Sequence, residues 1–233
     1  MSLKILSDSN FEIWTGEHWQ SYLRVPGNDE NSGSFSLYLT DYSVFGSGVV
    51  VLVNIPEISL LSGVYTDNLK LSSFILNKIV SRTGDYPFPD EMEIYDSDIL
   101  RFEDSNGEIG WRIIHSQNEI IAKWSDFKDP FFHSGGPQNQ KGQSVLSSLL
   151  IFAENSSIQV NKGLIKGTPY DRPTWRRTTG SSQSSCVIAF SEIIKIVDQI
   201  AEEKYNTELR KVLGTDAESV FSEIEKNNPL GGD

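Results

Sequence analysis

The chain has 233 residues, of which 38% are hydrophobic and 11% aromatic, enough for a sizeable core. Its 32 acidic and 20 basic residues give a net charge of −12, which argues against nucleic acid and anionic membranes as partners. The same charge permits a basic protein partner or a cationic ligand, although the ordinary requirements of solubility explain it equally well.

Cysteine content and hydropathy bear on location. Cys186 is the only cysteine, so no internal disulfide can form. The N-terminus lacks the apolar stretch of a signal peptide, and no segment approaches 18 consecutive apolar residues. We therefore expect a cytoplasmic protein with no membrane partner.

The first 63 residues predict short strands joined by turns. Residues 11–14 and 19–25 are the first candidates, with a turn at 15–17 between them. Residues 34–40 alternate between apolar and polar side chains, which is typical of a strand with one buried face. Residues 49–53 form a continuous apolar run that predicts a strand buried on both faces.

Residues 67–82 predict the first helix. Thr66 is the expected N-cap, and Leu71, Phe74 and Ile75 begin an apolar face that should cover a sheet face or one end of a barrel. Residues 85–108 then contain nine acidic side chains and one basic one, Arg101. They lack the spacing of a calcium loop, so we predict no metal site.

Residues 98–124 predict a three-strand antiparallel meander around which the fold is built. Asn106 and Gly107 tolerate the positive φ of a two-residue type I′ turn, and apolar and polar residues alternate on either side. This alternation places Trp111 and Ile113 on one face, so we expect Trp111 to be buried.

The rest of the chain predicts a second meander and a helical end. Residues 145–152, 157–160 and 163–167 are its strands, with a turn at 154–156, and residues 186–190 are the last strand. Residues 191–226 show helical spacing, and residues 227–233 should be a frayed tail.

These elements predict a single domain of the α+β class, mainly antiparallel. Residues 4–190 form its β-rich body, a meander-rich barrel or strongly curved sheet with one covering helix, followed by C-terminal helices. The architecture is loosely similar to that of lipocalin-type barrels, an analogy that rests on the order of elements and on no motif. Such barrels bind small apolar or partly hydroxylated molecules in their interior.

The first candidate site follows Trp124, in residues 125–144, a long stretch without periodicity. We expect Phe127, Phe131 and Phe132 to anchor this loop to the body. A histidine near a carboxylate can act as a general base, so Asp129 and His133 are the candidate catalytic pair. Trp124, Asp126 and Lys128 are candidate ligand contacts. The alternative is a surface loop with solvated charges.

The second candidate site lies in residues 170–177. Arginine recognises carboxylate or phosphate, and tryptophan stacks on rings or on guanidinium groups. We expect residues 174–178 to form a strand, so that Arg176 and Arg177 point to opposite faces and one is paired. The alternative is internal pairing with the acidic run at 85–108. The candidate ligand contacts are Tyr170, Arg172, Trp175, Arg176 and Arg177.

Two functions remain open, because the chain contains no short catalytic or cofactor motif. The first is a small-molecule-binding barrel, with isomerase or lyase chemistry carried by Asp129 and His133 and no cofactor. The second is an acidic interaction module, such as an inhibitor or immunity factor, that binds a basic protein without catalysis. A large apolar cavity would favour the first, and a filled core with an acidic surface the second.

Overall fold

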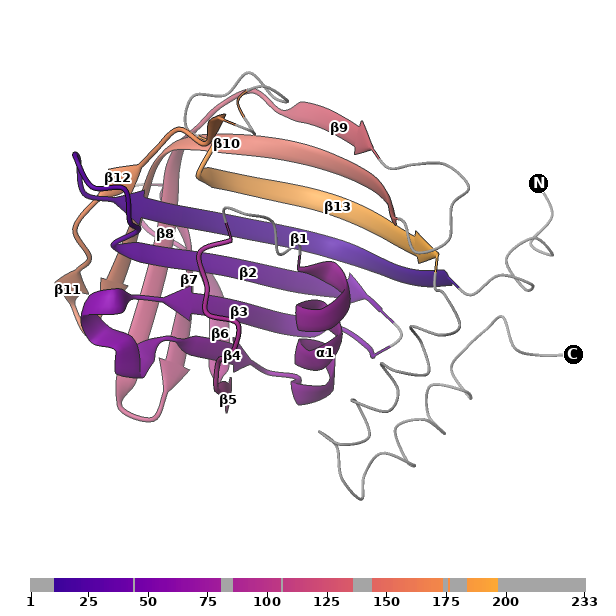
Figure 1. The fold of residues 1–233 in the computed structure, drawn as a ribbon, viewed down its shortest axis with the longest axis horizontal. Helices are drawn as coiled ribbons and strands as arrows, with labels where there is room; N and C mark the ends of the chain where they lie inside the picture. Colours follow the sequence, from indigo (N-terminus) through magenta and orange to yellow (C-terminus); the bar gives the residue numbers. More distant parts are fainter. Residues whose placement is uncertain are drawn as a thin grey trace, which may run out of the picture.

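The computed structural model describes residues 11–43, 45–80, 86–105, 107–135, 144–173, 176 and 184–196. Their strands form one strongly curved sheet, in the order β5-β4-β3-β2-β1-β13-β10-β8-β7-β6 (Figure 1). Neighbouring strands are antiparallel except for β4 and β5. The strands are β1 (Phe11–Arg24), β2 (Gly33–Tyr42), β3 (Gly48–Asn54), β4 (Gly63–Thr66), β5 (Ile94–Asp96), β6 (Asp98–Glu103), β7 (Ile109–His115), β8 (Asn118–Phe127), β9 (Phe131–Gly135), β10 (Ser144–Val160), β11 (Gly163–Leu164), β12 (Thr168–Pro169) and β13 (Cys186–Ile196).

The two ends of this order nearly meet, which makes the sheet a nearly closed barrel. β5 and β6 are its first and last strands, yet only Ser97 separates them in the sequence. His115 on β7 bridges them: its Nδ1 lies 3.1 Å from the backbone oxygen of Asp96, and its ring lies 4.8 Å from that of Tyr95. The predicted antiparallel barrel is therefore confirmed.

β3 is buried on both faces, as its apolar run predicts. Val49, Val51 and Val53 point into the barrel, where they join the main core. Val50 and Leu52 point outward and pack under the helix in a second core. The sheet therefore has a covered outer face over β2–β4 (Figure 1).

The covering helix is confirmed but starts later than predicted. It comprises α1 (Leu69–Phe74) and a π-helical turn, η3 (Ile75–Ile79), while the short 3-10 segment η2 (Pro56–Leu61) precedes β4. Asn68 is the N-cap, because its side chain accepts the amide of Leu71. Thr66 instead ends β4, where its hydroxyl donates to the backbone oxygen of Val49 at 2.8 Å.

The predicted turn at 15–17 is wrong, because β1 runs through it as one strand. The pairing of β1 with β2 shifts by one residue between Thr15 and Gly16, which is a β-bulge. A Cβ added at Gly16 would collide with the backbone oxygen of Leu39. The glycine therefore marks a close approach of two strands rather than a turn.

The predicted turn at 154–156 is also wrong, since β10 is one long bent strand. Its residues 144–152 pair with β13, and its residues 153–160 pair with β8. At the change of partner, Asp126 on β8 has a φ of 58° and its carboxylate accepts the side-chain amide of Asn155. In the sequence, a bend at which a strand changes its pairing partner has the same run of polar residues as a turn.

The last strand, β13, continues to Ile196, so the predicted helical start at residue 191 is wrong. β13 lies in the middle of the sheet and pairs with β1 on one side and β10 on the other. Backbone pairing along both edges of β13 outweighs the helical spacing of its apolar residues. The helices predicted for 197–226 and the tail at 227–233 lie outside the described residues.

The meander of residues 98–124 is confirmed, with Trp111 only 3% exposed. Its first turn is wider than the predicted two-residue type. The amide of Asp104 donates to the oxygen of Glu108, and the amide of Gly107 donates to Asp104, which leaves three residues in the loop. Gly107 takes the positive φ, 76°, that such a loop needs.

Candidate functional site at the rim of the barrel

The register of the sheet aligns inward-facing side chains in rows across neighbouring strands. Residues directly opposite each other on paired strands share a face, so the pairings trace each row. One row runs across six strands at the level where β9 joins the sheet. We call it the rim row, and it consists of Phe132, Leu149, Phe190, Glu17, Leu39 and Val49, on β9, β10, β13, β1, β2 and β3.

The rim row is apolar at both ends but exposed at only one. Phe132, Leu149 and Phe190 are 65%, 38% and 41% exposed, whereas Val49 at the other end is 5% exposed. Three large apolar side chains in register on adjacent strands form a contiguous exposed surface. Contiguous apolar surface of this kind marks an interaction site more often than scattered apolar residues do.

The next row inward is filled by packed side chains. Trp19 lies in it, 1% exposed, with its ring 5.2 Å from Trp124 and 5.9 Å from Trp111 in edge-to-face contacts. Phe35 packs on Trp124 from a third side. In the part of the chain that the structure describes, the centre of the barrel is thus a packed aromatic core rather than the large apolar cavity that would favour a ligand in the interior, and its rim is the accessible part.

A charged pair lies beside the exposed part of the rim row. Glu17 is opposite Phe190, and its carboxylate accepts the indole N–H of Trp19 at 2.7 Å. Arg101 reaches the same carboxylate at 3.5 Å from β6, and its guanidinium lies 5.0 Å from the Trp19 ring. Arg101 is 45% exposed and Glu17 13%, so the pair closes the rim at its solvent side.

Trp111 contributes an unpaired donor to this cluster. It is paired with Arg101 across β6 and β7, and its buried indole N–H has no acceptor among the described residues. Leaving a buried donor unpaired costs about 1–3 kcal/mol. An acceptor oxygen that reached this N–H would recover that cost.

Sequence reasoning missed Glu17 and Arg101 as site residues. The available signal is an acidic side chain two residues before a tryptophan on the same strand face. A carboxylate on an apolar face indicates either a partner from another element or a functional role. That partner, Arg101, was visible only as the single basic residue of the acidic run at 85–108.

The segment predicted as a loop at 125–144 forms strands over residues 125–127 and 131–135, so the prediction of a loop is wrong there. The prediction that three phenylalanines anchor this segment by burial is also wrong. Phe127 and Phe131 are each 37% exposed, and Phe132 is 65% exposed. Backbone pairing with β10 holds the segment, so side-chain burial is not needed. Residues 136–143 lie outside the described residues.

The candidate residues of this segment lie in different surroundings. Trp124 is a fully buried core residue whose indole donates to the backbone oxygen of Gln20. The carboxylate of Asp126 accepts a hydrogen bond from the side-chain amide of Asn155, and the Nζ of Lys128 lies 3.4 Å from the carboxylate of Glu154. Exposed Asp129 lies between β8 and β9, and half-buried His133 is on β9, adjacent to Phe132. Their catalytic role stays a prediction.

The second predicted site lies on the outer face of the sheet, over β1 and β2. Tyr170 donates its hydroxyl to Asn31 at 2.9 Å, and Arg24 lies 3.8 Å from its ring. Arg172 is 8% exposed, with its guanidinium 5.3 Å from the ring of Tyr22. Of the residues predicted for this site, Tyr170 and Arg172 thus lie over the same face of the sheet, each in contact with neighbouring side chains.

Arg176 is paired, as predicted, but neither its partner nor its backbone is the predicted one. It contacts Asp171 at 2.8 Å rather than a carboxylate of the acidic run. Its amide donates to the oxygen of Arg172, which is a helical rather than a strand contact. Trp175 and Arg177 lie outside the described residues.

His18 extends the outer-face cluster and was not singled out from the sequence. Its ring stacks on Tyr38 at 4.4 Å, and its Nε2 lies 2.8 Å from the hydroxyl oxygen of Ser36. Burial, followed by the charge of Arg172, lowers the pKa of His18 to about 4. Burial also raises the pKa of Tyr22 and of Tyr38, so all three side chains are neutral at pH 7.

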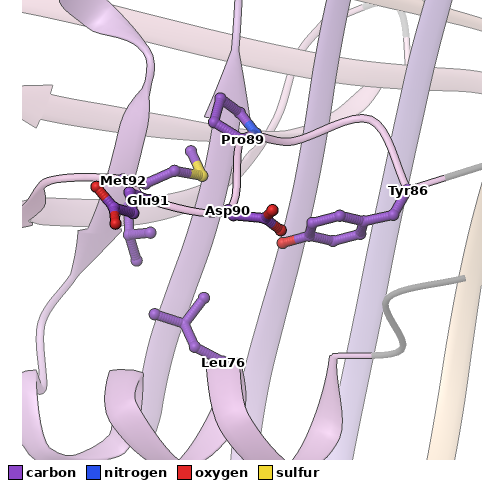
Figure 2. Close-up of a pocket in the computed structure, with 7 residues that line it drawn as sticks. Leu76, Tyr86, Pro89, Asp90, Glu91 and Met92 are labelled. Atoms are coloured by element: carbon purple, nitrogen blue, oxygen red, sulfur yellow. The ribbon is translucent and has the colours of Figure 1, made fainter.

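A small hollow of about 230 Å³ lies elsewhere on the outer face, between the covering helix and residues 86–92 (Figure 2). Its wall combines apolar side chains with two carboxylates, and the carboxylate of Asp90 lies beside the hydroxyl of Tyr86. It is smaller than typical small-molecule sites, about 300–1,000 Å³. The lining residues are Val64, Leu76, Tyr86, Pro89, Asp90, Glu91 and Met92.

Among the described residues, no three histidine, cysteine or acidic side chains are grouped as metal ligands. No helix in that part of the chain has the length and apolar content to cross a membrane.

Comparison with known proteins identifies no family for this chain. No family model and no curated protein matches the chain. A solved structure from Nitrosomonas europaea, provisionally named AttH, is 12% identical, with a match that covers 80% of this chain and 51% of that one. This chain thus spans about half the length of that protein. The TM-score is 0.25, so this likeness carries no argument.

Proposed function

We propose that this protein binds a small apolar molecule that carries a hydroxyl or carbonyl oxygen, at the rim of its barrel. The observation that carries the proposal is the exposed apolar part of the rim row, Leu149 and Phe190, beside the Glu17–Arg101 pair. Covering apolar surface contributes roughly 25 cal/mol per Å² buried. The binding energy comes from this surface, and the neighbouring polar groups supply orientation.

The polar groups select the ligand's functional group. The Trp111 indole has a donor to offer, Arg101 has further N–H donors, and the Glu17 carboxylate accepts. An alcohol oxygen both accepts and donates, so it satisfies both kinds of group at once. Because Glu17 already neutralises Arg101, a ligand with a full charge has less to gain than a neutral one.

The experiment compares three ligands that share a ten-carbon chain: 1-decanol below its solubility limit, and decanoate and decyltrimethylammonium below their critical micelle concentrations. Binding is followed by isothermal titration and by the emission of the tryptophans, since the indole of Trp19 contacts Glu17 and the ring of Trp111 lies 5.9 Å from that of Trp19. We expect saturable binding with the order decanol, decanoate, decyltrimethylammonium. Absence of saturable binding for all three contradicts the proposal.

Substitutions locate the site. Phe190→Ser should weaken decanol binding at least tenfold, because it removes the exposed apolar side chain that lies directly beside Glu17. Leu164→Ser is the matched control: Leu164 is 68% exposed on β11, away from the rim row, so its replacement should leave binding unchanged. Equal losses in both variants would place the ligand elsewhere.

The hollow of Figure 2 favours a second candidate function, recognition of a basic group of a protein partner. Asp90 and Glu91 line the hollow together with apolar side chains such as Leu76 and Met92, a combination that suits a lysine or arginine side chain. A lysine-rich peptide at low salt should bind the wild type more tightly than Asp90→Asn/Glu91→Gln. Glu57→Gln, a charge change on η2 outside the hollow, is the control. An equal effect of both changes would indicate a non-specific charge effect.

A further inference from the structure

We infer that the rim site is catalytic and moves a double bond of an apolar ketone, with Glu17 as the base and Arg101 as the group that binds the carbonyl oxygen. The two side chains come from β1 and β6, which are separated by four strands in the sheet order, so only the closure of the barrel brings them together. This inference rests on the proposed ligand site and names its substrate class.

Glu17 is a carboxylate in an otherwise apolar row of inward-facing side chains. Its neighbours in the register are Phe190 on β13 and Leu39 on β2. Its Oε2 accepts the indole N–H of Trp19 at 2.7 Å, whereas its Oε1 has only the 3.5 Å contact with Arg101 in the described part of the chain. A contact of that length is too long for a strong hydrogen bond. Oε1 is therefore the oxygen that can take up a proton.

Arg101 supplies the positive charge that such a reaction needs. Its guanidinium has five N–H donors, and its contacts with Glu17 use one nitrogen, Nη1. The side chain is 45% exposed, so the remaining donors can meet a ligand from solvent. A carbonyl oxygen gains negative charge when the adjoining carbon loses a proton, and fixed donors stabilise that charge. Trp111, directly opposite Arg101, carries the unpaired N–H that is available as a second donor.

The spacing of the two charged groups suits neighbouring atoms of one ketone. Oε1 of Glu17 and Nη1 of Arg101 are 3.5 Å apart. The oxygen of a ketone lies about 2.4 Å from the adjoining carbon, because the C=O and C–C bonds are about 1.23 and 1.52 Å long. A ketone that moves the exposed Arg101 slightly outward can thus contact the guanidinium through its oxygen and the carboxylate through the adjoining C–H.

The step is an isomerisation that needs no cofactor. Glu17 removes a proton from the carbon between the carbonyl and the double bond, and the electron pair of that C–H bond forms a dienolate whose oxygen Arg101 binds. The carbonyl then forms again, the double bond moves next to it, and the far carbon of the former double bond takes the proton back from Glu17. The product is the conjugated ketone, and both side chains return to their starting state.

The test uses dec-4-en-2-one, which has the ten carbons of decanol, and follows the absorbance of its conjugated isomer, dec-3-en-2-one. We expect saturable turnover by the full chain above the rate in buffer. Glu17→Gln should lower that turnover about a hundredfold or more, because a general base contributes at least this much. Arg101→Gln should lower it about a hundredfold through loss of a donor to the oxygen. Turnover by Glu17→Gln at the wild-type rate would overturn the inference.

The ion pair of Arg112 and Glu119 provides matched controls. These side chains are 3.2 Å apart, and Arg112 is 45% exposed, as Arg101 is. Arg112 follows the inward-facing Trp111 on β7 and therefore lies on the opposite face of the sheet. Arg112→Gln and Glu119→Gln should leave turnover unchanged. Losses equal to those of the rim variants would mean that surface charge, and not the rim pair, determines the rate.

Binding and turnover fail separately. A ketone that displaces decanol from the wild type but is not isomerised overturns this inference and leaves the proposed function intact. Absence of decanol binding contradicts the proposed function itself. If Glu17→Gln perturbs folding, Glu17→Asp is the second variant, because it keeps the carboxylate and moves it back by one methylene group. Its turnover should lie between that of the wild type and the buffer rate, and an unchanged rate would argue against Glu17 as the base.

Discussion

His18 is the side chain whose protonation the fold opposes most clearly. In an unfolded chain a histidine has a pKa near 6.5, whereas burial and the charge of Arg172 lower that of His18 to about 4. Between these values the unfolded chain binds a proton that the folded chain does not. Stability is therefore fully present above pH 6.5 and falls as the pH decreases toward 4.

The expected loss from His18 is up to about 2 kcal/mol between pH 7.5 and pH 5. Urea unfolding at both pH values measures it, and His18→Gln serves as the comparison because glutamine does not titrate. The wild type should lose more stability on acidification than the variant does. Identical pH dependence in both proteins would show that His18 takes up its proton equally in the folded and unfolded states.

Gly107 tests a backbone effect in isolation. Its φ is 76°, and a Cβ added there would meet no atom within 4 Å. Gly107→Val should therefore destabilise by about 1 kcal/mol or more through φ alone, since β-branched residues disfavour positive φ. Asn tolerates that conformation better, so Gly107→Asn should cost clearly less in urea unfolding. Equal costs would point to a cause other than φ.

Single residues were predictable where local chemistry decides their place. Alternation around the turn at Gly107 was enough to bury Trp111, and Val49–Val53 was correctly assigned to both faces of a strand. His18 and Glu17 were not recognised as members of a cluster. Their partners, Arg172 and Arg101, are 154 and 84 residues away in sequence, and only the sheet brings them together.

At the scale of elements, the bulge in β1 makes a specific prediction. Gly16→Ala should destabilise by about 1–3 kcal/mol, because the new methyl group collides with the backbone of Leu39 on β2. Gly27→Ala is a control for positive φ without a collision, since its φ is 89° and its surroundings are open. Thermal unfolding should show the larger shift for Gly16→Ala. The reverse order would mean that the bulge accommodates a side chain.

Element types were predictable more often than element ends. The covering helix, β3 and the meander each have a strong period and were found. β1 and β10 were each divided at a polar or glycine-containing segment that is a bulge or a bend. β13 was cut short at residue 190, because the pairing of both its edges outweighs its helical spacing.

At the scale of the whole molecule, the curved barrel-like class was predictable and the position of the site was not. Short strands, meanders and one helix already favour such a sheet. The rim row, however, depends on the register of six strands, and a shift of one residue in any of them reverses its faces. The sequence therefore led to the segment around Phe132 but assigned its phenylalanines to a buried anchor.

The four described tryptophans offer the most direct test of binding at the rim. Trp14 donates its indole N–H to Thr40 at 2.8 Å and Trp124 donates to Gln20 at 2.9 Å, while that of Trp111 has no acceptor in the described part of the chain. The measurement is the indole region of a ¹H–¹⁵N correlation spectrum during titration with 1-decanol, with the Trp111 signal assigned through Trp111→Phe.

We predict that the Trp111 signal moves downfield to a plateau as its N–H gains an acceptor. The signals of Trp14 and Trp124 should stay in place. A Trp111 signal that remains fixed at decanol concentrations that saturate the protein would contradict it.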